Sequence, residues 1–250
     1  MSIQQKITAI IPTLNEESNI QGAIRSLSFA HEILVVDSFS SDRTLSICKR
    51  ENVKVIQRRF DDFSSQKNFA IEQASFDWIF ILDADERITP ELASEVVEIV
   101  RDPKGIDAFN IYRTFFFKEK KVSFGGWQSD KVIRLFRKDK CRYDGKLVHE
   151  EIKCEGKIGF LKNRMDHFSY TDQEQYEKKL EFYALLQAKE LHQNKSRVTF
   201  MHRLVKPAFR FVVLYFVRFG FLDGKKGLVL ARVHAKGVLQ RYLKYKELKT

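Results

Sequence analysis

Cysteine and proline are scarce in this chain of 250 residues. Cys48, Cys141 and Cys154 are the only cysteines, far apart in the sequence and with no CxxC spacing. This excludes a zinc ribbon or a disulfide framework and is typical of a reducing compartment. Four prolines and eleven glycines exclude collagen-like and low-complexity chains. Apolar residues at 44% and charged residues at 31% predict a folded core.

Long apolar runs are also lacking. The most apolar one, residues 211–217, lies between Arg210 and Arg218 and is far shorter than the roughly 20 residues that span a bilayer. The first residues have too short an apolar stretch for a secretory signal. We therefore expect a cytoplasmic protein.

Positive charge is concentrated at one end. The chain has 44 Lys and Arg against 33 Asp and Glu. Residues 1–200 hold 32 basic and 31 acidic side chains, whereas residues 201–250 hold 12 and 2. A nearly neutral body with a basic tail argues against a protein that coats nucleic acid, so we expect no nucleic-acid partner.

Strand-like and helix-like segments alternate through the first hundred residues. Apolar, β-branched runs at 7–11, 32–37, 53–56 and 78–82 each precede a segment with helical spacing. This order predicts an α/β fold with a mostly parallel, doubly wound sheet, whose ligands bind beyond the carboxyl ends of the strands. Two later runs, 106–117 and 131–137, are expected as antiparallel additions to the sheet.

Local signals mark where single elements begin and end. Pro12 is expected to stop the first strand, and Ser18 with Gln21 resembles a capping box. Thr89 followed by Pro90 predicts another helix start, with Thr89 as the N-cap.

Polar residues follow the predicted strands where a ligand would bind. Asp83 and Asp85 come directly after an apolar strand, and two carboxylates at this spacing can reach a divalent cation and its phosphates. Residues 12–17 follow the first strand, Asp37 ends the second, and Lys67 adds a cation. Each pattern alone also fits an ordinary turn or helix surface, but four in order favour a binding site.

The runs that carry these residues resemble the N-terminal half of family 2 glycosyltransferases, which have the nucleotide-diphospho-sugar transferase fold called GT-A. The specific match covers residues 6–100: IIPTLNEE, EILVVDSFSSDRT, QKNFA and WIFILDADE. Later runs resemble the small transferases of lipopolysaccharide core assembly, which add glucose to an inner-core heptose: GGWQSDKVIRLFRK, KLVHEEI, MDHFSY and FVRFGFLDGKKGLVLA.

The resemblance implies a donor site for a UDP-sugar. Thr13, Glu17 and Asp37 would hold the uridine, and Lys67 would lie near the nucleotide. By the same resemblance, Pro12, Asn15 and Ala84 would also belong to the donor site.

The resemblance also implies a Mg²⁺ or Mn²⁺ cofactor. Asp83 would contact the ribose and the metal, and Asp85 would be the main metal ligand. His167 could reach the diphosphate or the metal, although a lone histidine is more often structural.

Inverting members of the family need a carboxylate base on the acceptor side. The matching place reads His149-Glu150-Glu151. We expect Glu150 to be the base, with Glu151 pointing away if the segment is extended. His149 could equally be the base or orient the acceptor.

Trp127, Asp130 and Arg134 are candidates for an acceptor wall, with Trp127 stacking on a sugar and Arg134 pairing with a phosphate or carboxylate. An edge strand with exposed arginines is the alternative for Arg134.

In the tail, aromatic and basic residues alternate, and residues 203–241 are expected to contact an anionic membrane surface. The alternative is a helix packed on the catalytic domain.

Together these features predict a transferase domain over 1–200 and a basic, aromatic, helical segment over 201–250. The hypothesis is an inverting hexosyltransferase that moves glucose from UDP-glucose to a lipid-linked saccharide of the lipopolysaccharide core, peripheral on the inner face of the cytoplasmic membrane. One rival is a transferase of the same fold with another glycan acceptor. The other is a non-catalytic protein that binds lipid or nucleic acid through its tail.

Overall fold

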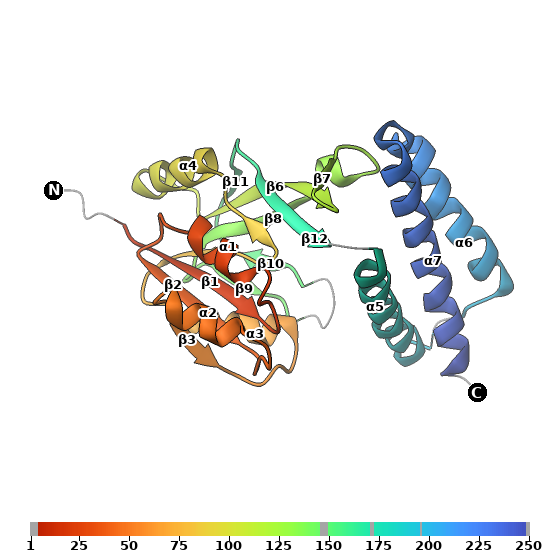
Figure 1. Ribbon diagram of the computed structural model, residues 1–250, viewed down its shortest axis with the longest axis horizontal. Coiled ribbons are helices and arrows are strands. Elements are labelled where there is room, and N and C mark those ends of the chain that lie inside the picture. The colour runs from red at the N-terminus through yellow and green to blue at the C-terminus, as the bar shows by residue number, and fades with distance from the viewer. Residues whose placement is uncertain (1–4, 146–149, 171–172, 196, 249–250) are drawn as a thin grey trace. The chain divides into compact units, whose positions relative to one another are not determined.

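The computed structural model describes residues 5–145, 150–170, 173–195 and 197–248, which form two compact units (Figure 1). Unit 1 comprises residues 1–113 and 131–167, and unit 2 comprises residues 114–130 and 168–250. The division differs from the expected boundary at residue 200, because helix α5 (Gln173–Gln193) packs against helix α7 (Lys225–Glu247) inside unit 2.

Unit 1 is built on a mixed sheet. Its strands are β1 (Ile7–Thr13), β2 (Glu32–Asp37), β3 (Lys54–Gln57), β4 (Trp78–Ile81), β5 (Glu86–Arg87), β6 (Ala108–Phe117), β8 (Lys131–Arg137), β11 (Ile158–Phe160) and β12 (Met165–Tyr170), of which β6 and β12 continue into unit 2. The strand order is β3-β2-β1-β4-β8-β6-β12-β5, and β11 pairs with β6. The first four strands are parallel, whereas β8 is antiparallel to both β4 and β6, as expected.

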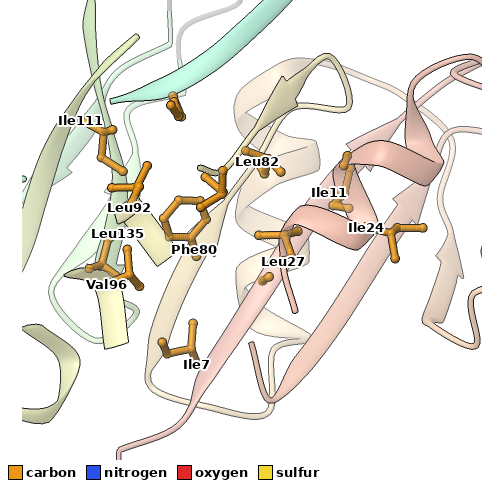
Figure 2. Close-up of a cluster of buried hydrophobic side chains, with 14 of the residues drawn as sticks. Ile7, Ile11, Ile24, Leu27, Phe80, Leu82, Leu92, Val96, Ile111 and Leu135 are labelled. Atoms are coloured by element: carbon orange, nitrogen blue, oxygen red, sulfur yellow. The ribbon is translucent and has the colours of Figure 1, made fainter. Parts of the chain in front are cut away.

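Helices cover both faces of this sheet, which confirms the doubly wound α/β arrangement. They are α1 (Ile20–Ser26), α2 (Thr44–Arg50), α3 (Phe63–Glu72) and α4 (Pro90–Arg101). Ile7 and Ile11 of β1 point to the core under α1 and α4 (Figure 2), and Ile10 points to a second core under α3. This alternation follows from the two-residue period of a strand and explains why β1 is apolar throughout.

Two local expectations need correction. β1 continues through Pro12, which pairs in register with Val36. Pairing on the β4 side ends where Leu82 N donates to Ile10 O, so a missing N–H at position 12 costs no ladder bond. Helix α1 has Asn19 as its N-cap, without the Ser18 capping box, because the Gln21 amide donates to Glu51 instead.

The helix start at Thr89 is confirmed. The Thr89 Oγ1 accepts from Leu92 N at 3.2 Å, and Pro90 occupies the first turn of α4. This cap starts α4 a few residues after the strand-end carboxylates. The segment between β4 and α4 is therefore short, and the cap fixes its far end.

A small second sheet in unit 1 pairs β9 (Cys141–Tyr143) with β10 (Ile152–Cys154). Cys141 and Cys154 lie directly opposite each other in this pair, although thirteen positions separate them in the chain. Asn68 of α3 holds β9 by donating to Tyr143 O and accepting from Tyr143 N. These two hydrogen bonds fix Tyr143 beside the middle of α3.

Unit 2 is mainly helical, with α7 lying between α5 and α6 (Phe200–Val212) (Figure 1). A π-helical turn η2 (Val213–Val217) and a 3₁₀ turn η3 (Gly220–Asp223) connect α6 to α7. Strand β7 (Lys120–Val122) pairs with the end of β6, and η1 (Trp127–Ser129) follows it. None of the described helices has the length and apolar character that a membrane crossing requires.

The Asp223 carboxylate holds the loop before Trp127. It accepts from the backbone N–H groups of Ser123 and Phe124 at 2.8–3.1 Å. The backbone also turns tightly between η3 and α7. A Cβ on Gly227 would lie 1.8 Å from Gly220 O, so only glycine fits at position 227.

Candidate functional site

The two strand-end aspartates sit in a turn that is held from several sides. Asp83 N donates to Glu86 Oε2 at 3.0 Å. The Arg87 guanidinium donates to Ala84 O and to Asn19 O, each at 2.8 Å. Arg87 therefore ties the turn after β4 to the loop after β1, which gives the two strand ends a fixed spacing.

Beneath this turn lies a cluster of buried charges. The Glu86 carboxylate is fully buried and accepts from Arg134 at 2.7 Å and from Arg113 at 3.1 Å. Arg134 also donates to the Asp83 carboxylate. Each buried charge thus has a partner of opposite sign, as burial requires.

Lys67 of α3 joins this cluster to Glu150 of the segment predicted to lie on the acceptor side. Its Nζ lies 3.7 Å from Asp83 Oδ1 and 2.8 Å from Glu150 Oε1. It also stands 5.1 Å from the centre of the Tyr143 ring, which belongs to β9. One ammonium group therefore contacts both the strand-end motif and the segment predicted to supply the base.

Burial and charge compete in this cluster, and charge decides the outcome. Burial would raise the pKa of Asp83, but Arg134 and Lys67 hold it well below its usual range. Burial would lower the pKa of Lys67, but the carboxylates of Asp83 and Glu150 raise it. Burial raises the pKa of Tyr143 itself. At neutral pH Asp83 is thus an anion, Lys67 a cation and Tyr143 a neutral phenol.

Asp85 points to a different partner. Its Oδ2 lies 3.5 Å from His167 Nε2, because β12 pairs antiparallel with β5 and sets His167 opposite Glu86. The structure thus brings two of the three proposed metal ligands together. The third, Asp83, is engaged by Arg134 and Lys67.

The residues present fit a divalent cation shared with a substrate. Among the described residues, no group of three or more His, Cys, Asp or Glu side chains could hold a metal ion. Mg²⁺ in phosphate sites uses one or two carboxylates, with phosphate oxygens and waters completing its coordination. Asp85 would supply one such carboxylate, with His167 beside it.

The proposed donor residues after β1 form a compact loop with the residues after β2. Asn15, with a φ of 54°, accepts from Ser41 N at 2.8 Å. Glu17 accepts from Arg43, whose hydrogen bonds hold the pKa of that carboxyl below its usual value. Pro12 lies within β1, and Ala84 is buried in the core.

Thr13 and Asp37 end neighbouring strands and pair in register. Thr13 is buried, and no described residue offers its hydroxyl a hydrogen bond. Asp37 is fully buried and accepts from Ser40 and from Gln57 at 3.1 Å. Asp37 therefore stabilises its own loop, and the Thr13 hydroxyl next to it has no partner among the described residues.

The three proposed acceptor residues lie in different surroundings. Arg134 was expected at an acceptor wall or on an exposed edge, but it is buried, because β8 lies between β4 and β6. Trp127 and Asp130 belong to unit 2, where the Trp127 ring stacks on Phe115 at 5.3 Å.

Glu150 and Glu151 differ as their alternation predicts. Glu150 is mostly buried against Lys67, whereas Glu151 is exposed and its N–H donates to Asp144. His149 lies outside the described residues.

Sequence reasoning missed Glu86, Arg87, Arg113 and Tyr143. Glu86 could have been noticed because it directly follows the strand-end pair Asp83 and Asp85. An acid buried at such a place needs a basic partner, here an arginine. Arg113 and Tyr143 carried none, because their place depends on strand pairing.

The chain is similar to known glycosyltransferases. The model of the family described as glycosyl transferase family 2 matches residues 8–152. An uncharacterized glycosyltransferase of Rickettsia typhi is 29% identical over 98% of this chain and 88% of its own length. A lipopolysaccharide core biosynthesis glycosyltransferase of Rhizobium meliloti is 28% identical over 94% of this chain and 93% of its own length.

Among solved structures, glucosyl-3-phosphoglycerate synthase from Mycobacterium tuberculosis, in complex with Mn²⁺ and UDP, is 21% identical with a TM-score of 0.39. The alignment covers 45% of this chain and 44% of that one. This likeness is too distant to assign a site. The family model spans more than half of the chain and agrees with the mixed α/β sheet, which confirms the expected fold class. The chain belongs to glycosyl transferase family 2, and it is a glycosyltransferase of the GT-A type.

Proposed function

We propose that this glycosyltransferase transfers glucose from UDP-glucose to a lipid-linked saccharide of the lipopolysaccharide core. The transfer of this hexose inverts its anomeric carbon. The observation that carries the proposal is the position of Lys67 between Asp83 and Glu150. It supports the proposal because Asp83, proposed for the donor side, and Glu150, proposed for the acceptor side, contact the same ammonium group.

The donor end of the site is the edge where β1, β2 and β4 finish. Thr13 offers an unsatisfied hydroxyl there, and the Asn15 and Glu17 loop closes beside it. We propose that Thr13 hydrogen-bonds the uridine, with Asp37 holding the loop in place. Lys67 would face the diphosphate, since its ammonium is charged and already lies near Asp83.

Asp85 and His167 would hold Mg²⁺ or Mn²⁺ with the diphosphate oxygens. The bound cation would neutralise the negative charge that grows on the departing UDP. Asp83 would then position the turn and contact the ribose, with its charge fixed by Arg134.

Glu150 would act as the base. Its carboxylate takes the proton from the acceptor hydroxyl as that oxygen forms a bond to the anomeric carbon. The bond from this carbon to the UDP oxygen breaks on the opposite side, and the electron pair leaves with UDP. Direct displacement of this kind inverts the anomeric carbon.

The lipopolysaccharide-type acceptor is supported by the Rhizobium meliloti relative, which matches almost the whole chain. Such an acceptor is anchored in lipid, so we propose that the enzyme works at the inner face of the cytoplasmic membrane. The basic residues of the segment 203–241 would face anionic lipid there. Trp127 and Asp130 of unit 2 are proposed to contact the acceptor.

Calorimetric titration tests the donor first. UDP is titrated with and without Mn²⁺, followed by a panel of UDP-sugars. Metal-dependent binding with a preference for UDP-glucose is expected. Tight binding of another nucleotide sugar would replace the donor, and no nucleotide binding under any condition would refute the proposal.

A further inference from the structure

Helix α6 has an unusual orientation for a surface helix. Large apolar side chains normally pack inward and polar ones face the solvent. In α6 most of the outward positions are apolar, with Lys206 as the exposed exception. The apolar positions continue into η2: Met201, Leu204, Val205, Ala208, Phe209, Val212 and Phe216. These residues recur three or four positions apart, so they form one stripe, called here the apolar face of α6.

The exposure of this face is large. Phe209 is 65% exposed and Met201 is 61% exposed. Phe200, next to the stripe, is 63% exposed. No residue of α6 is buried. A contiguous apolar surface of this kind marks a place where another apolar phase is met.

Polar residues of α6 contact its neighbour α7 instead. His202 packs edge-on against the Tyr242 ring of α7, and Lys206 Nζ lies 5.6 Å above the same ring. Arg210 is half-buried, and this burial lowers its pKa. The positive charges of Arg218 and Arg241 lower the pKa of Arg210 further. The polar contacts thus fix which side of α6 is turned outward.

Charge selects the partner. Residues 201–250 hold 12 basic and 2 acidic side chains, and Arg218 and Lys225 are exposed beyond the end of α6. A second copy of the chain would bring the same positive charge against this surface. A bilayer with anionic headgroups offers acyl chains to the apolar face and negative charge to its rim.

We propose that α6 inserts its apolar face into an anionic bilayer and lies in the plane of the interface. With 13 residues the helix is about 20 Å long, which suits this placement. Attachment then comes chiefly from burial of these side chains among acyl chains, and the basic residues add attraction at the headgroups. The proposal rests on the proposed function only for the identity of the membrane.

Vesicle binding by the full chain tests the insertion. Vesicles of phosphatidylglycerol with phosphatidylethanolamine are compared with vesicles of phosphatidylcholine alone. Leu204→Ser with Phe209→Ser is expected to lower partitioning about tenfold or more, since two large apolar side chains leave the interface. The matched control is Phe182→Ser, which alters a 52% exposed phenylalanine on α5 and should leave partitioning unchanged.

A second measurement reports depth. Phe209→Trp is expected to be quenched by lipids brominated on their acyl chains, whereas Phe182→Trp is not. Release of the wild type by high salt together with unquenched Phe209→Trp would overturn insertion. Unchanged vesicle binding of the double variant would also overturn insertion. This holds even if the double variant changes the self-association of the protein, because the apolar face would then serve a second copy of the chain and not a membrane. UDP titration of the double variant separates this result from the donor proposal, because its donor site is intact.

Discussion

Lys67 Nζ lies 2.8 Å from Glu150 Oε1, although the two residues are 83 positions apart in the chain. The contact forms because α3 places Lys67 beside the hairpin that leads to Glu150, and Asn68 fastens the two elements together. The same ammonium lies near Asp83. A single buried cation therefore connects the proposed donor and acceptor sides.

Glu150→Gln is expected to lower turnover by about 100- to 10,000-fold, because the amide cannot take the acceptor proton. Binding of UDP should persist, since the change leaves the strand-end residues intact. Steady-state kinetics with calorimetry measures both. The control is Glu151→Gln, at an exposed position. Unchanged turnover in Glu150→Gln would move the base to His149 or Glu151.

Asp85→Ala is expected to remove the effect of Mn²⁺ on UDP binding and to lower turnover at least about 100-fold, because the metal loses its carboxylate. Chelation by EDTA should reduce the wild type to the same level, and added Mn²⁺ should restore only the wild type. Asp77→Ala, a change at an exposed aspartate, is the control. Full activity of Asp85→Ala would contradict the metal role.

Glu86→Gln is expected to lower the free energy of unfolding by about 3 kcal/mol, because the buried Arg134 and the partly buried Arg113 lose their shared carboxylate. Urea unfolding gives the value. Glu98→Gln changes an exposed acid of α4 and should stay within about 0.5 kcal/mol of the wild type. Equal stability of the two variants would show that the buried cluster contributes nothing.

His234 makes stability depend on pH. Burial, aided by Arg210, lowers the pKa of His234 to about 4, and its Nε2 pairs with the Tyr176 hydroxyl. Between about pH 4 and about pH 6.5, His234 binds a proton in the unfolded chain but not in the folded chain. This contribution is therefore complete above about pH 6.5 and is lost as the pH falls, by about 2 kcal/mol at pH 5.

Unfolding of the wild type and of His234→Gln at pH 7 and pH 5 measures that loss. The variant has no titrating ring and should show a smaller decrease between the two pH values. An identical decrease in both proteins would assign the pH dependence to other groups.

Cys141 and Cys154 are expected to be joined by a mild disulfide oxidant in the folded protein. The hydrogen bonds at 140–155 and 144–151 make 141–154 a non-hydrogen-bonded pair, in which the Cα atoms come closest. Burial, with a hydrogen bond to Cys154, raises the pKa of the Cys141 thiol, so the reaction should be slow at neutral pH. Peptide mapping should find the 141–154 cross-link and a reduced Cys48. Cross-links to Cys48 would contradict this geometry.

Much of unit 1 was predictable from local pattern. The apolar runs predicted β1 to β4, and their alternation with helical segments predicted a doubly wound sheet because parallel strands need crossover helices. The exceptions were local. Pro12 stays in its strand where the neighbouring β4 has ended, and Gln21 bonds to Glu51 instead of closing a capping box.

The sequence by itself determined the strand-end carboxylates, the apolar strands and the basic tail, since these depend on residue type and short-range spacing. Tertiary structure decided which charges meet. It buried Arg134 inside the sheet, put His167 beside Asp85 and joined Lys67 to Glu150. It also turned the apolar face of α6 outward by pairing its polar side with Tyr242. Such contacts depend on strand order and helix rotation, which single-chain spacing does not encode.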